Sequence, residues 1–123
     1  MTNPTILSSL GDFTVQQLLG IPAASVTLTT GSGTLNAPIG KITTVALTTA
    51  AQASASFTIS DSFIAAGDMV LAGVANGTNS AGQPVVSSCV VSAGQVVVKI
   101  ANVDPTNAFN GTLVITLLWI PYL

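Results

Sequence analysis

Short stretches in which apolar and hydroxyl-bearing residues alternate run through most of the chain. The cleanest is residues 54–60, where every second position is apolar: Ala55, Phe57 and Ile59. A period of two is that of a β-strand with one buried face. Residues 95–103 repeat it, and the positions expected to face inward are Val96, Val98 and Ile100. The pattern therefore predicts a protein built from sheets.

Turn-forming residues separate these stretches at short intervals, as in a sandwich or barrel. The predicted strands are residues 25–30, 41–49, 54–60, 68–75, 84–92, 95–103 and 112–120. Ala93-Gly94 predicts a hairpin between two of them. Glu and Arg, which favour helices, are absent, whereas β-branched residues are common. We expect an all-β fold, an antiparallel β-sandwich of about seven or eight short strands.

The first 24 residues differ from the rest and are expected to form an N-terminal arm, followed by a β-sandwich domain over residues 25–123. One short helix fits within the arm, because Asp12 or Thr14 can cap its start and Gly20 its end. Two turns of helix need tertiary support. The arm is expected either to dock on a neighbouring subunit or to close one end of its own domain.

The last predicted strand is apolar on both faces. One face carries Leu113, Ile115, Leu117 and Trp119, and the other carries Val114, Thr116, Leu118 and Ile120. A strand buried on both sides needs cover that one small sandwich does not readily supply. The second face is therefore expected to be a subunit contact or to lie under the arm. The candidate protein-contact residues are Phe13, Leu18, Leu19, Leu118, Trp119, Ile120 and Tyr122.

Charged side chains are scarce, at 5% of the residues against about 25% in typical soluble domains. They are Lys41, Lys99, Asp12, Asp61, Asp68 and Asp104. Two lysines cannot neutralise a row of phosphates, so we expect no nucleic-acid partner. So few charges also provide little repulsion between copies. This favours a surface covered by neighbours over the polar surface of a soluble monomer.

Residues for catalysis or metal binding are also scarce. The chain has no histidine, the commonest general base and metal ligand. Cys89, the single cysteine, has no basic neighbour in sequence that would activate it. Asp61 follows a predicted strand and Asp104 precedes a proline, so both are expected to cap turns rather than to bind Ca²⁺. We predict no catalytic residue, no cofactor and no metal.

Two Asn-Gly-Thr motifs, at residues 76–78 and 110–112, match the acceptor pattern for N-glycosylation. We predict no secretory signal, because no basic region or long apolar run opens the sequence, and we interpret both motifs as turns. The longest apolar stretch, residues 113–121, is shorter than the ~20 residues of a membrane-spanning helix. No membrane partner is expected.

A family resemblance rests on four segments: residues 41–50, 57–71, 76–78 and 102–113. The most specific is the turn Asn107-Ala-Phe-Asn-Gly-Thr112, which leads into the last predicted strand. From Gly40 onward, the chain resembles small β-rich proteins that are encoded near the capsid genes of tailed bacteriophages. Some of these are capsid decoration, or cement, proteins. The resemblance implies a β-sandwich or jelly-roll-like module, often trimeric, over capsomer junctions, and it carries no catalytic residues.

The function implied by this resemblance is that of a virion structural protein on the capsid exterior, made in the host cytoplasm. Its expected partners are the major capsid protein and copies of itself, as a homotrimer. Two alternatives stay open. One is another virion component, such as a head fibre base, a minor coat protein or a tail accessory protein. The other is a β-module that binds carbohydrate or a host surface. We expect no enzyme.

Overall fold

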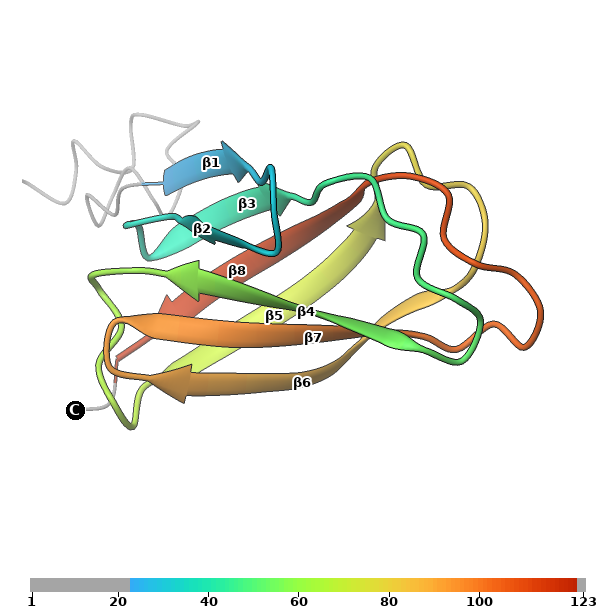
Figure 1. The fold of residues 1–123 in the computed structure, drawn as a ribbon. Helices are drawn as coiled ribbons and strands as arrows, with labels where there is room; N and C mark the ends of the chain where they lie inside the picture. Colours follow the sequence, from blue (N-terminus) through green and yellow to red (C-terminus); the bar gives the residue numbers. More distant parts are fainter. Residues whose placement is uncertain (1–22, 122–123) are drawn as a thin grey trace, which may run out of the picture.

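The computed structural model describes residues 23–121, which form eight strands and no helix. The strands are β1 (Ala23–Thr27), β2 (Ser32–Thr34), β3 (Ile39–Thr43), β4 (Ser54–Ser60), β5 (Met69–Asn76), β6 (Pro84–Ser92), β7 (Gln95–Asn102) and β8 (Leu113–Ile120). They form two four-stranded sheets, ordered β1-β3-β8-β5 and β2-β4-β7-β6 (Figure 1). The prediction of an all-β sandwich is confirmed. The helix predicted near Asp12 lies outside the described residues.

The prediction that all strands pair antiparallel is wrong for two pairs. β1 pairs with β3, and β2 with β4, in parallel, whereas the other four pairs are antiparallel. The reason is that the chain switches sheets at each step from β1 to β4, as Figure 1 shows. Two successive reversals return it to the first sheet in its original direction. The sandwich is therefore built from two mixed sheets.

Residues 32–34, which lie between two predicted strands, form the short edge strand β2. This strand contains no large apolar residue, so no alternation marks it in the sequence. Its pairing continues past its end, where the Leu35 N–H donates to the Ser60 carbonyl at 2.8 Å. Leu35 itself is buried, and its packing holds the segment against the second sheet.

β3 ends at Thr43, earlier than the predicted end of that strand at Thr49. Beyond it, the N–H groups of Thr44 and Leu47 donate to the carbonyls of Leu113 and Gly111, each at 2.9 Å. The two donors are three positions apart, whereas the two acceptors are two positions apart. The segment after β3 therefore carries an extra residue, and the strand period of two is lost. In contrast, β4 and β6 have the predicted bounds, and β6 and β7 form the predicted hairpin.

The core lies between the two sheets and uses the faces expected from the alternation. Val96, Val98 and Ile100 of β7 are fully buried, opposite the β4 residues Ile59, Phe57 and Ala55. The first sheet contributes Ile42, Leu113, Ile115 and Leu117. Leu113, Ile115 and Leu117 of β8 therefore face inward, as predicted. Trp119, expected on the same face, is half-buried near the strand end.

The buried side chain of Asn102 joins loops at the end of the sandwich opposite Ile120 (Figure 1). Its Nδ2 donates to the carbonyls of Thr49 (3.2 Å), Ala50 (3.3 Å) and Asn107 (2.8 Å). Its Oδ1 accepts from the N–H groups of Gln83 (3.0 Å) and Asp104 (3.2 Å). Asn102 thus joins three loops that are distant in sequence.

Candidate interaction surface

The outward faces of the two sheets differ in chemistry. On the β2-β4-β7-β6 sheet, exposed outward positions are mostly hydroxyl-bearing and include Ser54, Ser56, Ser60, Ser88 and Ser92, beside Lys99. On the other sheet, β5 and β8 expose four large aliphatic side chains: Met69 (56%), Leu71 (51%), Leu118 (39%) and Ile120 (37%). We call these four residues the aliphatic face. It is the strongest candidate for a surface that contacts another protein.

Strand register places the four residues of the aliphatic face in two directly opposed pairs. Met69 lies opposite Ile120, and Leu71 lies opposite Leu118. Ile39 of β3 lies on the other side of Leu118 and is half-buried. Directly opposed side chains on one sheet face are near neighbours. An apolar row therefore crosses β3, β8 and β5 without interruption.

The next outward row along these strands limits the apolar surface. It consists of Lys41, Thr116 and Gly73, in register across β3, β8 and β5. Lys41 brings the positive charge of this row, and Thr116 is exposed. The aliphatic face is therefore confined to the end of the sandwich at which β8 finishes and β5 begins (Figure 1).

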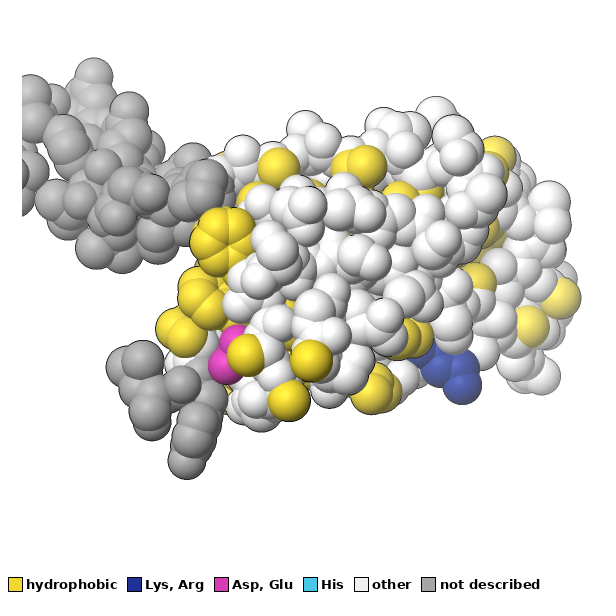
Figure 2. All heavy atoms as spheres, turned by 60° about the vertical axis from the view of Figure 1, so that its left-hand side comes forward, with side chains coloured by type: hydrophobic (Ala, Val, Ile, Leu, Met, Phe, Trp, Pro, Cys, Tyr) yellow, Lys and Arg dark blue, Asp and Glu magenta, His cyan; other side chains and the backbone are white. Residues whose placement is uncertain are grey.

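Aromatic residues adjoin the aliphatic face at this end. The Trp119 Nε1–H donates to Asp68 Oδ2 at 2.8 Å, and the Ala65 N–H donates to the same oxygen at 2.8 Å. The rings of Trp119 and Phe63 pack with centroids 5.8 Å apart at an angle of 60°. Figure 2 shows hydrophobic side chains gathered at this end around an acidic side chain. The ring of Trp119 is thus fixed in position from two sides.

The structure separates the predicted contact residues into three groups. Leu118 and Ile120 are exposed on the aliphatic face. Trp119 is half-buried and supports this end of the sandwich rather than forming the centre of the surface. Phe13, Leu18, Leu19 and Tyr122 lie outside the described residues.

Sequence reasoning missed Met69, Leu71 and Phe63 as exposed apolar residues. The segment of β5 was predicted as an apolar strand, but its neighbours Val70 and Leu71 are both aliphatic, so no alternation shows which of them faces outward. The structure shows that Val70 is buried and Leu71 is exposed.

The two aspartates predicted to cap turns do so, in contrasting surroundings. Asp61 is 2% exposed, and burial raises its pKa, although the backbone N–H groups of Phe63 and Ala37 act in the opposite direction. Asp104 Oδ1 accepts from the N–H groups of Thr106 and Asn107 at 2.8 Å each, and these bonds lower its pKa. Both carboxyl groups accept hydrogen bonds within their own turns, and that of Asp61 also accepts one from the distant residue Ala37.

Cys89 lies half-buried in β6, with its Sγ 3.7 Å from the Val70 carbonyl oxygen. Burial raises the pKa of its thiol, which reduces the fraction of nucleophilic thiolate. Among residues 23–121, no group of three or more His, Cys, Asp or Glu side chains is placed to hold a metal ion. No helix in that range could cross a membrane.

No family model matches the chain, and neither a curated protein nor a solved structure matches it significantly. The fold and the surface define a broad class, that of mixed-sheet β-sandwiches with one aliphatic outward face. The function that follows is inferred from this surface and from the composition of the chain.

Proposed function

We propose that this chain is a virion structural protein, a capsid decoration (cement) protein that stabilises capsomer junctions through protein–protein contacts. The observation that carries the proposal is the aliphatic face, four large apolar side chains in two opposed pairs with no charge among them. Exposed apolar patches of this kind mark interaction sites. The low content of charged residues, 5% of the chain, agrees with a surface that is covered by other protein subunits.

The aliphatic face joins copies of the chain in a homotrimer. Interfaces between identical subunits have more apolar cores than transient interfaces do, and charged residues are depleted there. Burial of apolar surface contributes about 25 cal/mol per Å² before the costs of association are subtracted. Leu71 and Leu118 lie directly opposite each other within the face, and both gain from this burial.

The trimer binds the major capsid protein on the outside of the particle, after synthesis in the host cytoplasm. The hydroxyl-rich face of the second sheet suits such a contact, because serine hydroxyls cost less to desolvate than charges do. Three linked copies also bind more firmly than one copy with the same single contacts. The chain needs no catalytic residue, cofactor, nucleic acid or membrane for this role. The parallel β1-β3 and β2-β4 pairs depart from the antiparallel jelly roll that the family resemblance implies.

The alternative of a carbohydrate-binding module has less support, because it requires exposed aromatic rings. Among the described aromatic residues, Phe57 and Phe109 are buried, and Trp119 is half-buried with its Nε1–H bonded to Asp68. Phe63 is 39% exposed, but its ring packs against Trp119. The other alternative, a different virion component, would use the same apolar contacts and is separated from the proposal by its place on the particle.

Adding the purified chain back to phage particles that lack it tests the proposal. We expect cryo-electron microscopy to show the chain at capsomer junctions. Leu118→Asp should lower its occupancy, because it places a charge within the aliphatic face. Val103→Asp is the matched control, since Val103 is an exposed aliphatic residue in the loop after β7 and lies on neither of the two faces. Density at the tail or at a fibre, or equal occupancy for both variants, would contradict the proposal.

A further inference from the structure

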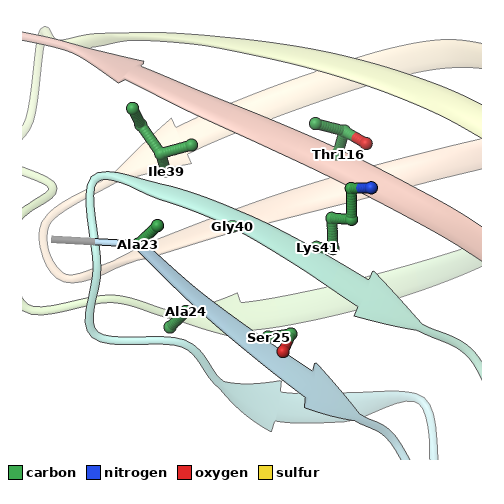
Figure 3. A pocket seen from close by; sticks show the side chains of 7 residues that line it. All are labelled: Ala23, Ala24, Ser25, Ile39, Gly40, Lys41 and Thr116. Carbon is green, nitrogen blue, oxygen red and sulfur yellow. The ribbon is translucent and has the colours of Figure 1, made fainter. Parts of the chain in front are cut away.

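A hollow of about 420 Å³ lies beside the aliphatic face, over β1, β3 and β8. Figure 3 shows its lining, which includes Ala23 and Ser25 of β1, Ile39 and Lys41 of β3, and Thr116 of β8. Register explains the grouping, because Ala23 lies opposite Ile39, Ser25 opposite Lys41, and Lys41 opposite Thr116. The hollow is therefore part of the outward face of this sheet.

The chemistry of the hollow is mixed in a specific way. Ala23 and Gly40 contribute small apolar surface, and Ile39 adds an aliphatic wall. Two hydroxyl groups come from Ser25 and Thr116, and Lys41 is the single charged residue among the described residues of the lining. In Figure 3, the side chains of Lys41 and Thr116 lie beside each other. The hollow suits an apolar segment that carries one negative charge.

We propose that the hollow is the docking site for residues 1–22 of the same molecule. This segment is rich in large apolar residues: Ile6, Leu7, Leu10, Phe13, Val15, Leu18, Leu19 and Ile21. Its one charged side chain is that of Asp12. The charge of Asp12 is complementary to that of Lys41, so the segment matches the hollow in both polarity and charge.

Connectivity favours the chain's own segment over that of a second copy. Ala23 belongs to the lining and follows residue 22 directly, so the segment is attached at the rim of the hollow. Strands lie about 4.8 Å apart, so crossing from β1 to β8 covers roughly 10 Å. Twenty-two residues reach up to about 70 Å when extended. A short tether also gives an effective concentration of about millimolar.

Docking in the hollow leaves most of the aliphatic face open. The hollow lies on the β1 and β3 side of Thr116, whereas Met69 and Leu71 lie on β5, across β8. The segment that fills the hollow and the partner that binds the aliphatic face can therefore be different. This inference does not rest on the proposed function and can fail without it.

Paramagnetic relaxation in the full chain tests the proposal. In a Cys89→Ala background, Gly73→Cys carries a nitroxide spin label, because Gly73 lies opposite Thr116 in open space beside the hollow. Lys99→Cys is the control, since Lys99 is exposed on the outward face of the other sheet. We expect the label at Gly73, but not the label at Lys99, to cause strong loss of NMR amide signals from residues 1–22.

A second sample identifies which molecule supplies the segment. Both samples use the Leu71→Ser/Leu118→Ser background, so that the aliphatic face brings no second copy close to the label. The second sample mixes ¹⁵N-labelled chains without a nitroxide with unlabelled chains that carry the nitroxide at Gly73→Cys, and we expect the signals of residues 1–22 to survive in it. Loss in this mixture would overturn the proposal, because the segment would then come from another copy. Equal signals with the two label positions would also overturn it.

A variant of the hollow keeps the test independent of label placement. Ser25→Trp on the exposed edge strand β1 should fill the hollow and restore the signals of residues 1–22 next to the Gly73 label. The amide signals of β4 and β7 report that the sandwich is still folded. If the label at Gly73 still removes the signals of residues 1–22 in a folded Ser25→Trp protein, docking in the hollow would be contradicted.

Discussion

Thr78 and Thr112 hold each other by a reciprocal pair of hydrogen bonds. The backbone N–H of each residue donates to the Oγ1 of the other at 2.9 Å, and the two hydroxyl oxygens are 3.2 Å apart. Glycines precede both threonines, and a Cβ at Gly111 would lie 2.6 Å from Thr78 Oγ1. The two Asn-Gly-Thr motifs, expected to be turns, therefore join the end of β5 to the loop before β8.

Removing either hydroxyl of this pair should weaken the fold. Thr78→Val leaves the Thr112 N–H without its acceptor, and Thr112→Val does the same to Thr78. We expect each to lower the free energy of unfolding by about 1 kcal/mol, as measured by urea denaturation. Thr78→Ser keeps the hydroxyl and serves as the control. Loss of stability in Thr78→Ser equal to that in Thr78→Val would show that the hydrogen bond is not the cause.

The buried amide of Asn102 leads to a sharper prediction. Asn102→Asp preserves shape but replaces the Nδ2 donor, which faces three carbonyl groups, by an oxygen. We expect a loss of about 3 kcal/mol or more at neutral pH, because the new charge is buried beside acceptors. Denaturation at several pH values should show partial recovery in acid, where the new carboxyl is protonated. An Asn102→Asp protein as stable as the wild type would contradict this role.

Asp61 should make the stability of the wild-type chain depend on pH. Its pKa is raised above the ordinary 3.8 by burial, so the folded state favours the protonated form. The free energy of unfolding should therefore fall as pH rises from about 4 through the raised pKa. Asp61→Asn should remove this change, as followed by denaturation at each pH. Asp104 has a lowered pKa, so its contribution is lost only below 3.8. An unchanged pH profile in Asp61→Asn would contradict the assignment.

The aliphatic face should contribute little to the fold of a single chain. We expect Leu71→Ser and Leu118→Ser each to lower the free energy of unfolding by no more than about 1 kcal/mol, because both side chains are exposed and lose only cross-strand contacts. Denaturation must be measured under conditions in which the chain is a monomer. Phe57→Ala, in the buried core, should cost about 3–5 kcal/mol and serves as the reference. A large loss in the leucine variants would mean that the face is part of the core.

Much of the sandwich could be predicted from local patterns. Alternation identified β4, with Phe57 and Ile59 inward, because one face of this strand is buried and the other meets water. Ala93-Gly94 identified the β6–β7 hairpin, because a two-residue turn between two strands is also a local signal. β2 and the parallel pairs could not be found in this way. They depend on the chain switching between sheets, which leaves no periodic trace in residues 32–34.

The candidate surface was predictable only on β8. Leu118 and Ile120 stood out because that strand is apolar on both faces, so one face had to lie outside the core. Leu71 could not be placed, since Val70 beside it is also aliphatic and only pairing with β8 determines which of the two faces outward. Pairing with β8, and not the residues of β5 itself, therefore determined the β5 half of the aliphatic face.

Multi-angle light scattering of the purified full chain tests the central claim, that the aliphatic face joins copies of this protein. We predict a mass of about three times that of the 12.3 kDa chain for the wild type and for Val90→Ser. The Leu71→Ser/Leu118→Ser double variant should move toward the mass of a single chain. A wild type that stays at the single-chain mass at every concentration, or a double variant as large as the wild type, would contradict the account.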